Sequence, residues 1–463
     1  MKYTFNDGFW WGAASSAPQT EGASTGHGKS PTKWDHWFQL QPDMFYGRVG
    51  PENASDFYHQ YKADIARMKE TGLNSFRTSI SWSRLIPNGD GVLNPEGVAF
   101  YNSMIDEMLA QGIEPVINLY HFDTPMWLME KGGEESREFV DSFAQYAKTC
   151  FELFGDRVTQ WMTFNEPVVT PLSGYISGHH YPCLHDMKKA VQVAYHTQVA
   201  SSKAIQAFRR GGHKGRIGII INVAPPYPRD QNNTEDVKAA HILDLLTNRS
   251  FLDPSVLGYY PDELCALLRT LGILPETLPE DADIIRNNTV DYLGVNYYHP
   301  ERVKMRETPY EGPRPMPGMF YEHYEMPGAN MNVSRGWEIY EDALYDVAVN
   351  IRDNYKNIPW FVSENGMGVQ DEERYMDADG MVQDDYRIDF IQRHLKVLHK
   401  AIADGSSCFG YHLWTFCDNW SWINAYKNRY GLYRVDIENG LRRSAKKSAL
   451  WMRDMIRDGG FDD

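Results

Sequence analysis

The feature that most constrains the fold is a repeated alternation between short apolar segments and longer segments with helical periodicity. Apolar runs rich in β-branched and aromatic residues recur eight times, as is typical of buried strands. Strands that are apolar on both faces belong to a parallel sheet covered by helices. We therefore predict an α/β fold, a closed (β/α)8 TIM barrel. The expected strands span residues 9–15, 74–81, 114–121, 158–165, 216–223, 291–298, 359–364 and 409–414.

The segments between the strands carry start and stop signals for helices. Ser55 is expected to cap the helix after the first strand, and Asn94-Pro95 is expected to open the next one. No shift in composition or linker divides the chain, so we expect one barrel domain over residues 1–463. Long loops after the strands should form the active-site cleft. An insertion over residues 304–334, rich in Pro, Met, Gly and aromatic residues, should wall that cleft.

Charge and cysteine usage restrict the partners that this protein can have. The formal net charge of −16 argues against nucleic acid or an anionic membrane as a partner, and any anionic substrate must meet a local basic patch. The N-terminus lacks an apolar signal core, and no run is long enough to span a membrane, so we expect a cytoplasmic protein. The five cysteines are scattered without metal-ligand spacing.

Two of the expected strands end in glutamate. The fourth runs through Thr163-Phe164 into Asn165-Glu166-Pro167, and the seventh runs through Phe361-Val362-Ser363 into Glu364. Two carboxylates at the ends of two buried strands suit acid/base and nucleophilic chemistry on one bond. The alternative is that each glutamate simply begins a polar loop.

Further polar and aromatic side chains stand where the other strands finish. In a barrel these positions converge on the C-terminal face, where active sites are built. A histidine at a strand end is by itself often only a structural hydrogen-bonding group, and it is the convergence that favours a site. The side chains concerned are Gln19, Glu21, Arg77, His121, Asn296, Tyr298 and Trp414.

Together these residues resemble glycoside hydrolase family 1, the retaining β-glycosidases. The resemblance rests first on the two glutamate segments, residues 163–167 and 363–366. It covers essentially the whole chain, because further family segments follow in the same order. These are residues 9–14, 19–22, 76–82 and 430–433.

The resemblance implies that Glu166 is the general acid/base and that Glu364 is the nucleophile. Retaining chemistry places two such carboxyl groups about 5–5.5 Å apart. By the same analogy, Arg77 and Tyr298 keep Glu364 ionised, and the charge of Glu364 raises the proton affinity of Glu166.

The resemblance also implies roles around the sugar ring. Asn165 is expected at the 2-hydroxyl, with Asn296 also in the substrate site. Gln19 and His121 are expected near the 3-hydroxyl. The aromatic rings expected are Trp414 beneath the sugar and Trp337 beside the leaving group. No phosphate-cradling loop, nucleotide fingerprint or metal cluster is present, so no cofactor is implied.

The segment after the eighth strand resembles the 6-phospho-β-glycosidases of this family. Family members that act on neutral sugars usually carry glutamate where Ser421 stands, and a carboxylate there would repel a 6-phosphate. Tyr430 and Phe122 also match the phosphate-specific enzymes. The substrate class implied is a 6-phospho-β-glucoside or 6-phospho-β-galactoside.

One position departs from that pattern and leaves alternatives open. A phosphate-binding lysine is expected at position 428, where this chain has Asn428, with Lys427 beside it. Trp422 resembles the galactose-specific enzymes, so the preferred epimer stays open. The alternatives are a β-glucosidase acting on unphosphorylated β-glucosides and a non-catalytic sugar-binding barrel.

Overall fold

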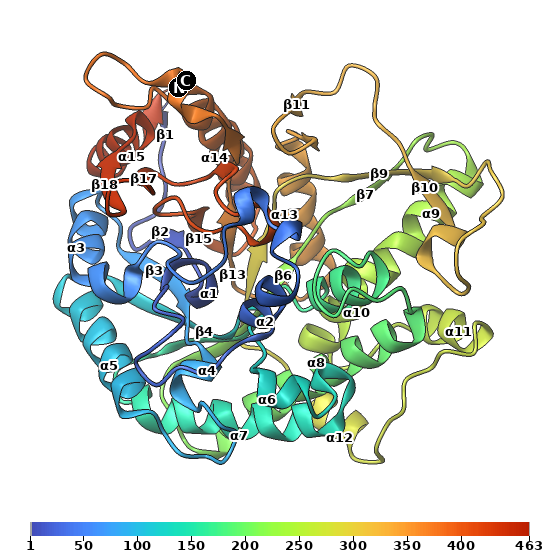
Figure 1. Ribbon diagram of the computed structural model, residues 1–463. Coiled ribbons are helices and arrows are strands. Elements are labelled where there is room, and N and C mark those ends of the chain that lie inside the picture. The colour runs from blue at the N-terminus through green and yellow to red at the C-terminus, as the bar shows by residue number, and fades with distance from the viewer. Residues whose placement is uncertain (1, 463) are drawn as a thin grey trace.

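The computed structural model describes residues 2–462, and its centre is a closed barrel of eight parallel strands (Figure 1). The strand order around the ring follows the chain, with β15 between β13 and β2 closing the barrel. The predicted (β/α)8 barrel is therefore confirmed. Its strands are β2 (Trp10–Ala14), β3 (Ser75–Ser79), β4 (Glu114–Tyr120), β5 (Gln160–Asn165), β6 (Arg216–Asn222), β8 (Tyr292–Asn296), β13 (Trp360–Asn365) and β15 (Cys408–Trp414).

Helices surround the barrel and bury their apolar faces against it (Figure 1). Asn94 caps α5 as expected, since its side chain accepts a hydrogen bond from the amide of Glu96 at 3.2 Å. The longer helices are α2 (Lys33–Leu40), α3 (Phe57–Glu70), α5 (Pro95–Ala110), α7 (Arg137–Phe154), α8 (Met187–Arg210), α9 (Thr234–Asp244), α11 (Asp262–Thr270), α12 (Asp281–Asn287), α13 (Asp342–Asn354), α14 (Asp385–Ala403) and α15 (Lys447–Arg457).

Short helices occupy the loops. They are α1 (Ala17–Thr20), α4 (Trp82–Leu85), α6 (Met126–Met129), α10 (Ser250–Leu252), the 3₁₀ turns η1 (Pro42–Met44), η2 (Tyr46–Arg48), η3 (Gly133–Glu135), η7 (Pro317–Met319), η8 (Glu372–Tyr375) and η9 (Trp422–Asn424), and the π-helical turns η4 (Thr170–Ile176), η5 (Leu245–Arg249) and η6 (Asp253–Leu257).

The helix cap predicted at Ser55 is wrong. Helix α3 begins at Phe57 after Asp56, and no side chain caps it. The Ser55 hydroxyl instead donates to the carbonyl of Asp418 at 2.8 Å, in the loop that follows β15. This bond joins two loops that lie 363 positions apart in the sequence.

The interior of the barrel is filled by side chains from several strands. Val116, Met162, Ile220, Tyr292 and Phe361 are fully buried and pack into one cluster. The barrel is therefore a packed core and not a pore, which leaves its C-terminal edge as the place for polar groups.

Small strands organise the long loops. The expected insertion at 304–334 begins inside β9 (Glu301–Met305), which pairs with β7 (Pro226–Pro228) and β10 (Tyr321–His323). The other small pairs are β1 (Lys2–Tyr3) with β19 (Phe461–Asp462), β11 (Met331–Asn332) with β12 (Trp337–Glu338), β14 (Val369–Gln370) with β16 (Asn428–Arg429), and β17 (Tyr433–Asp436) with β18 (Arg442–Ala445). No helix within residues 2–462 is both long enough and apolar enough to cross a membrane.

Candidate active site

The glutamates at the ends of β5 and β13 are linked through β8. The Asn296 amide nitrogen donates to the Asn165 side-chain oxygen at 3.1 Å and to Glu166 Oε1 at 2.8 Å. Its own oxygen accepts from the hydroxyl of Ser363, the residue before Glu364, at 2.6 Å. Asn296 therefore fixes the position of one glutamate relative to the strand that carries the other.

Each oxygen of Glu364 is bound by a different group. Arg77, which is fully buried on β3, forms an ion pair with Oε1, and Tyr298 donates its hydroxyl to Oε2 at 2.6 Å. Burial and the charge of Glu364 raise the pKa of Tyr298 well above its usual value, so this phenol stays a donor. Glu364 is thus held in one orientation, with a cation at one carboxylate oxygen and a neutral hydrogen-bond donor at the other.

Glu166 has the opposite electrostatic setting. Its carboxyl group is withdrawn from water, and the charge of Glu364 lies nearby, so the pKa of Glu166 rises to about 8. Asn296 and Arg77 oppose that rise. Glu166 therefore carries a proton at neutral pH. Its φ of +44° is a left-handed conformation that side chains rarely adopt, and such conformations collect at functional sites.

His121 and Gln19 are further buried polar side chains expected at this site. His121 has its Nε2 3.3 Å from the amide nitrogen of Asn165 and its Nδ1 3.4 Å from Arg77. Burial, aided by the charge of Arg77, lowers the pKa of His121 well below its usual value, so the ring is neutral. Gln19 is held by Ser16, whose hydroxyl donates to its oxygen at 2.8 Å. These groups suit hydrogen bonds to sugar hydroxyls.

Glu21 does not belong to this group. Its carboxylate accepts from Arg84 Nε at 2.8 Å and from the Tyr101 hydroxyl at 2.8 Å. The described side-chain contacts of Glu21 are with Arg84 and Tyr101, and none is with Glu166 or Glu364.

Two aromatic surfaces flank the polar groups. The Trp414 ring is stacked against His121 at 6.1 Å and lies 5.9 Å from the Arg77 guanidinium. The Trp337 ring is half-buried and lies 5.5 Å from the ring of Tyr298. A sugar that contacts Glu364 and Tyr298 would therefore meet apolar faces as well as hydrogen-bonding groups.

The loop after β15 supplies Ser421, Trp422 and Tyr430. Trp422 is stacked on Trp34 with ring centroids 4.4 Å apart and lies 6.0 Å from His121. Tyr430 packs with Trp414 and Tyr298 in one cluster, and Ser421 is buried. The structure thus brings Trp422 and Tyr430 to the rings that surround the glutamates.

Lys427 and Asn428 take different positions. The Lys427 ammonium lies 5.7 Å from the ring centroid of Tyr46, a side chain of the loop after β2. Asn428 is only 2% exposed, and its side-chain oxygen has no hydrogen-bond partner among the described residues.

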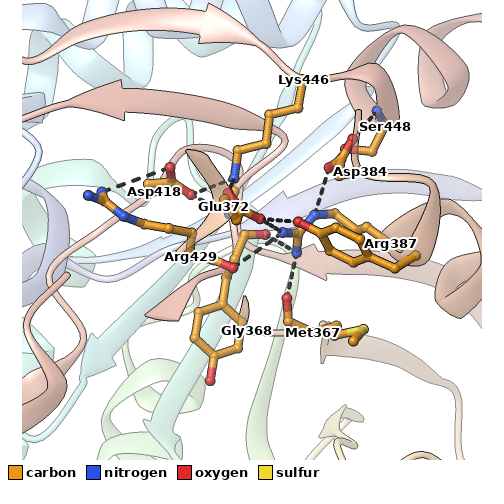
Figure 2. A network of polar contacts seen from close by, with 12 residues as sticks. Met367, Gly368, Glu372, Asp384, Arg387, Asp418, Arg429, Lys446 and Ser448 are labelled. Atoms are coloured by element: carbon orange, nitrogen blue, oxygen red, sulfur yellow. Dashed lines mark hydrogen bonds and ion pairs between the residues drawn. The ribbon is translucent and has the colours of Figure 1, made fainter. Parts of the chain in front are cut away.

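A buried ionic network joins Arg387 and Lys446 to Glu372, Asp384 and Asp418 (Figure 2). Arg387 of α14 donates to the carbonyl oxygen of Met367 at 2.6 Å and to that of Tyr430 at 3.0 Å. The guanidinium therefore ties the loop after Glu364 to the loop that carries Ser421. Sequence reasoning missed this network because helix periodicity assigns Arg387 to a face but names no partner for it.

No group of three or more histidine, cysteine, aspartate or glutamate side chains within residues 2–462 is arranged to hold a metal ion. A cavity of about 380 Å³ between α8 and α11 contains neither glutamate. It is lined mainly by apolar side chains such as Met187, Leu264 and Leu268.

Comparison with protein families gives one match along nearly the whole chain. The model of glycosyl hydrolase family 1 matches residues 1–461. The chain is 53% identical over 461 residues to the 6-phospho-β-glucosidase GmuD of Bacillus subtilis (strain 168), covering 99% of both proteins. It is 36% identical to the 6-phospho-β-galactosidase of Streptococcus mutans serotype c, covering 98% of both.

Relatives and structures named as β-glucosidases are also similar. The chain is 34% identical to β-glucosidase A of Acetivibrio thermocellus, covering 99% of the chain and 100% of the relative. The family 1 β-glucosidase from Thermotoga maritima superposes with a TM-score of 0.92 at 32% identity, covering 100% of both chains.

Proposed function

We propose, since this chain belongs to glycosyl hydrolase family 1, that it hydrolyses 6-phospho-β-D-glycosides with retention of configuration at the anomeric carbon. The chain is a glycoside hydrolase by family, and its substrates are carbohydrates. The observation that carries the mechanism is the unequal setting of the two glutamates. Glu166 is protonated near neutral pH, whereas Glu364 is bound to a guanidinium and a phenol.

The first step uses this difference directly. Glu364 attacks the anomeric carbon while Glu166 passes its proton to the leaving oxygen, so the glycosidic bond breaks and a glycosyl ester of Glu364 forms. Arg77 and Tyr298 orient the attacking carboxylate. Asn165 binds the 2-hydroxyl, where a hydrogen bond strengthens as the transition state forms.

The second step returns both glutamates to their starting states. When Glu364 becomes an ester its charge disappears, so the pKa of Glu166 falls and this residue can act as a base. Glu166 then removes a proton from water, which attacks the anomeric carbon and releases Glu364. Two inversions give the β-configured product.

The 6-phosphate is assigned to the loop after β15, which carries Ser421 and places Tyr430 against Trp414. Ser421 offers a hydroxyl where a carboxylate would repel an anion, and Tyr430 offers a phenol whose raised pKa keeps it a donor. The similarity to proteins named as 6-phospho-β-glucosidase and 6-phospho-β-galactosidase supports the same substrate class.

A second candidate is hydrolysis of unphosphorylated β-glucosides. Asn428 favours it, because a buried amide replaces the lysine expected for phosphate. Ser421 and Phe122 disfavour it.

Activity should be lost on the alkaline side because Glu166 must be protonated to act as the acid. The active form exists below its pKa, and kcat/KM for an alkyl glycoside should fall as the pH rises through about 8. The measurement is the pH profile of kcat/KM for wild type on an alkyl glycoside, and for both wild type and Glu166→Gln on an aryl glycoside that the variant still cleaves. The alkaline limb should vanish in the variant; an unchanged limb would assign that titration to another group.

Introducing a negative charge at Ser421 should shift the substrate preference from the 6-phosphorylated to the neutral glycoside. Ser421→Glu should lower kcat/KM on the 6-phosphorylated glycoside by more than about a hundredfold, since it sets a buried carboxylate against phosphate. Activity on the neutral glycoside should be equal or higher. Ser421→Ala serves as the control that removes the hydroxyl without adding charge. Equal losses on both sugars in Ser421→Glu would count against a phosphate at this position.

A further inference from the structure

The cations around the loop after β15 differ in whether they are already paired. Arg387 and Lys446 are buried within the network and are compensated by Glu372, Asp384 and Asp418 (Figure 2). Their ion pairs stabilise the loop after β15. Neither is available to an anionic ligand without breaking a buried ion pair, which is strongly destabilising.

Arg429 and Lys427 point to other partners. The Arg429 guanidinium has a charged neighbour, since its Nη1 lies 3.9 Å from Asp418, although that nitrogen is buried and has no hydrogen-bond partner among the described residues. It also lies 5.2 Å from the ring centroid of Tyr426. Lys427 lies over Tyr46. The described contacts of both side chains are therefore with Asp418, Tyr426 and Tyr46, and none of them is with Tyr430 or Ser421.

Arg335 is different, because it has no charged partner within residues 2–462. Its Nε atom is buried and has no hydrogen-bond partner among the described residues, and the side chain forms no ion pair there. The guanidinium is stacked on the ring of Trp337, 4.2 Å from the centroid. A half-buried guanidinium without a counter-ion is costly, and an anionic ligand would remove that cost.

The turn that carries Arg335 is fixed beside Tyr430. The Asn332 side chain donates to the carbonyl of Gly368 at 3.0 Å, and the Ser334 hydroxyl accepts from the amide of Gln370 at 3.1 Å. Gly368 lies against the Tyr430 ring so closely that an added Cβ would fall 2.3 Å from it. Burial raises the pKa of Tyr430, and the charge of Arg335 is the leading effect that opposes this rise.

We propose that Arg335 is the cation that binds the 6-phosphate, together with Tyr430 and Ser421. It supplies from the β11–β12 turn the positive charge that position 428 lacks. A guanidinium stacked on a ring keeps its edge N–H groups free, and these match two phosphate oxygens. This assignment rests on the proposed function, because it presumes a phosphorylated sugar.

The test compares Arg335→Ala, Arg335→Lys and wild type on 4-nitrophenyl β-glucoside and on its 6-phosphate. Arg335→Ala should lower kcat/KM on the phosphorylated substrate by about ten- to a hundredfold, with little change on the neutral one. Arg335→Lys should restore part of the loss. The inhibition constant for glucose 6-phosphate should rise in parallel, whereas that for glucose should not.

Arg314→Ala provides the matched control, because Arg314 is an exposed arginine of the same insertion, 5.9 Å from the ring of Tyr310. It should leave both activities unchanged. Because the 4-nitrophenyl leaving group is uncharged, the only anionic group of the phosphorylated substrate is on the sugar. If Arg335→Ala instead impairs only a neutral glucoside with a carboxylated aryl leaving group, Arg335 serves the leaving group and the assignment fails.

Two further outcomes separate this assignment from the proposed function. If wild type prefers the phosphorylated sugar, but Lys427→Ala and not Arg335→Ala removes that preference, only the assignment of Arg335 is overturned. If wild type prefers the neutral sugar, the phosphate specificity itself fails. Thermal unfolding of each variant excludes misfolding as the cause of a loss.

Discussion

Glu364→Ala is expected to lower kcat by at least about a thousandfold, because it removes the atom that attacks the anomeric carbon. The Glu364 side chain is buried, and in the variant Arg77 and Tyr298 lose their shared partner. Initial rates on a 4-nitrophenyl 6-phosphoglycoside would measure the loss. The thermal midpoint of unfolding should be recorded as well, because a buried Arg77 without its partner could destabilise the fold. A lower rate caused by unfolding could then be separated from the loss of the nucleophile.

Azide distinguishes a missing nucleophile from a damaged fold. A small anion can enter the space left by the Glu364 side chain and attack from the same face, which gives an α-glycosyl azide by a single inversion. Added azide should therefore restore turnover of activated substrates in Glu364→Ala and not in Glu364→Gln, where the amide fills the space. A β-configured azide from Glu364→Ala would contradict the role assigned to Glu364.

Glu166→Ala should produce a loss that depends on the leaving group. Substrates with poor leaving groups need protonation and should lose about a hundred- to ten-thousandfold in kcat/KM. Substrates with good leaving groups should still form the glycosyl-enzyme, which then hydrolyses slowly because no base activates water. A burst of nitrophenol followed by a slow steady state is the expected time course.

The product formed with azide provides the control for this second variant. Azide should attack the accumulated glycosyl-enzyme from the face that water uses, which gives a β-configured azide. Proton nuclear magnetic resonance of the product reports the configuration. Rescue of Glu166→Ala with inversion would mean that the roles of Glu166 and Glu364 are exchanged.

The barrel was predictable because its strands are buried on both faces. The middle of a strand such as β6 must be apolar on both faces, and a run like Ile219-Ile220-Ile221 is typical of such a strand. Parallel strands also place their carboxyl ends at one edge. The strand pattern therefore predicted that Arg77 and Glu364 lie at the same face of the barrel, and the family resemblance predicted their contact.

Contacts made by loops were not predictable in the same way. Ser55 has the residue type of a helix cap, yet its hydroxyl bonds to Asp418, because tertiary contact overrides a local preference. Glu21 is a second example, because its carboxylate accepts hydrogen bonds from Arg84 and Tyr101, which the sequence around Glu21 does not indicate. The local sequence indicates a residue's preference for a helix cap or a loop, but not which distant side chain or carbonyl group it will contact.

Arg335 illustrates the same limit at the substrate site. It stands in a turn without periodicity, and nothing in Ser334-Arg335-Gly336 distinguishes it from a solvated surface arginine. Its stacking on Trp337 and the absence of a counter-ion within residues 2–462 are properties of the folded loop. Asn428 could be recognised as a departure from a family pattern, but the cation proposed to compensate for it lies 93 positions earlier in the chain.

The central claim is that this cleft acts on a sugar phosphorylated at its 6-position. The most direct test is kcat/KM of the wild-type protein on 4-nitrophenyl β-glucoside and on its 6-phosphate, followed by the corresponding galactosides. We expect the phosphorylated member of at least one pair to be preferred by at least a hundredfold or so, because the site is built to bind the anion. Equal values in both pairs, or a preference for the unphosphorylated sugars, would contradict the claim.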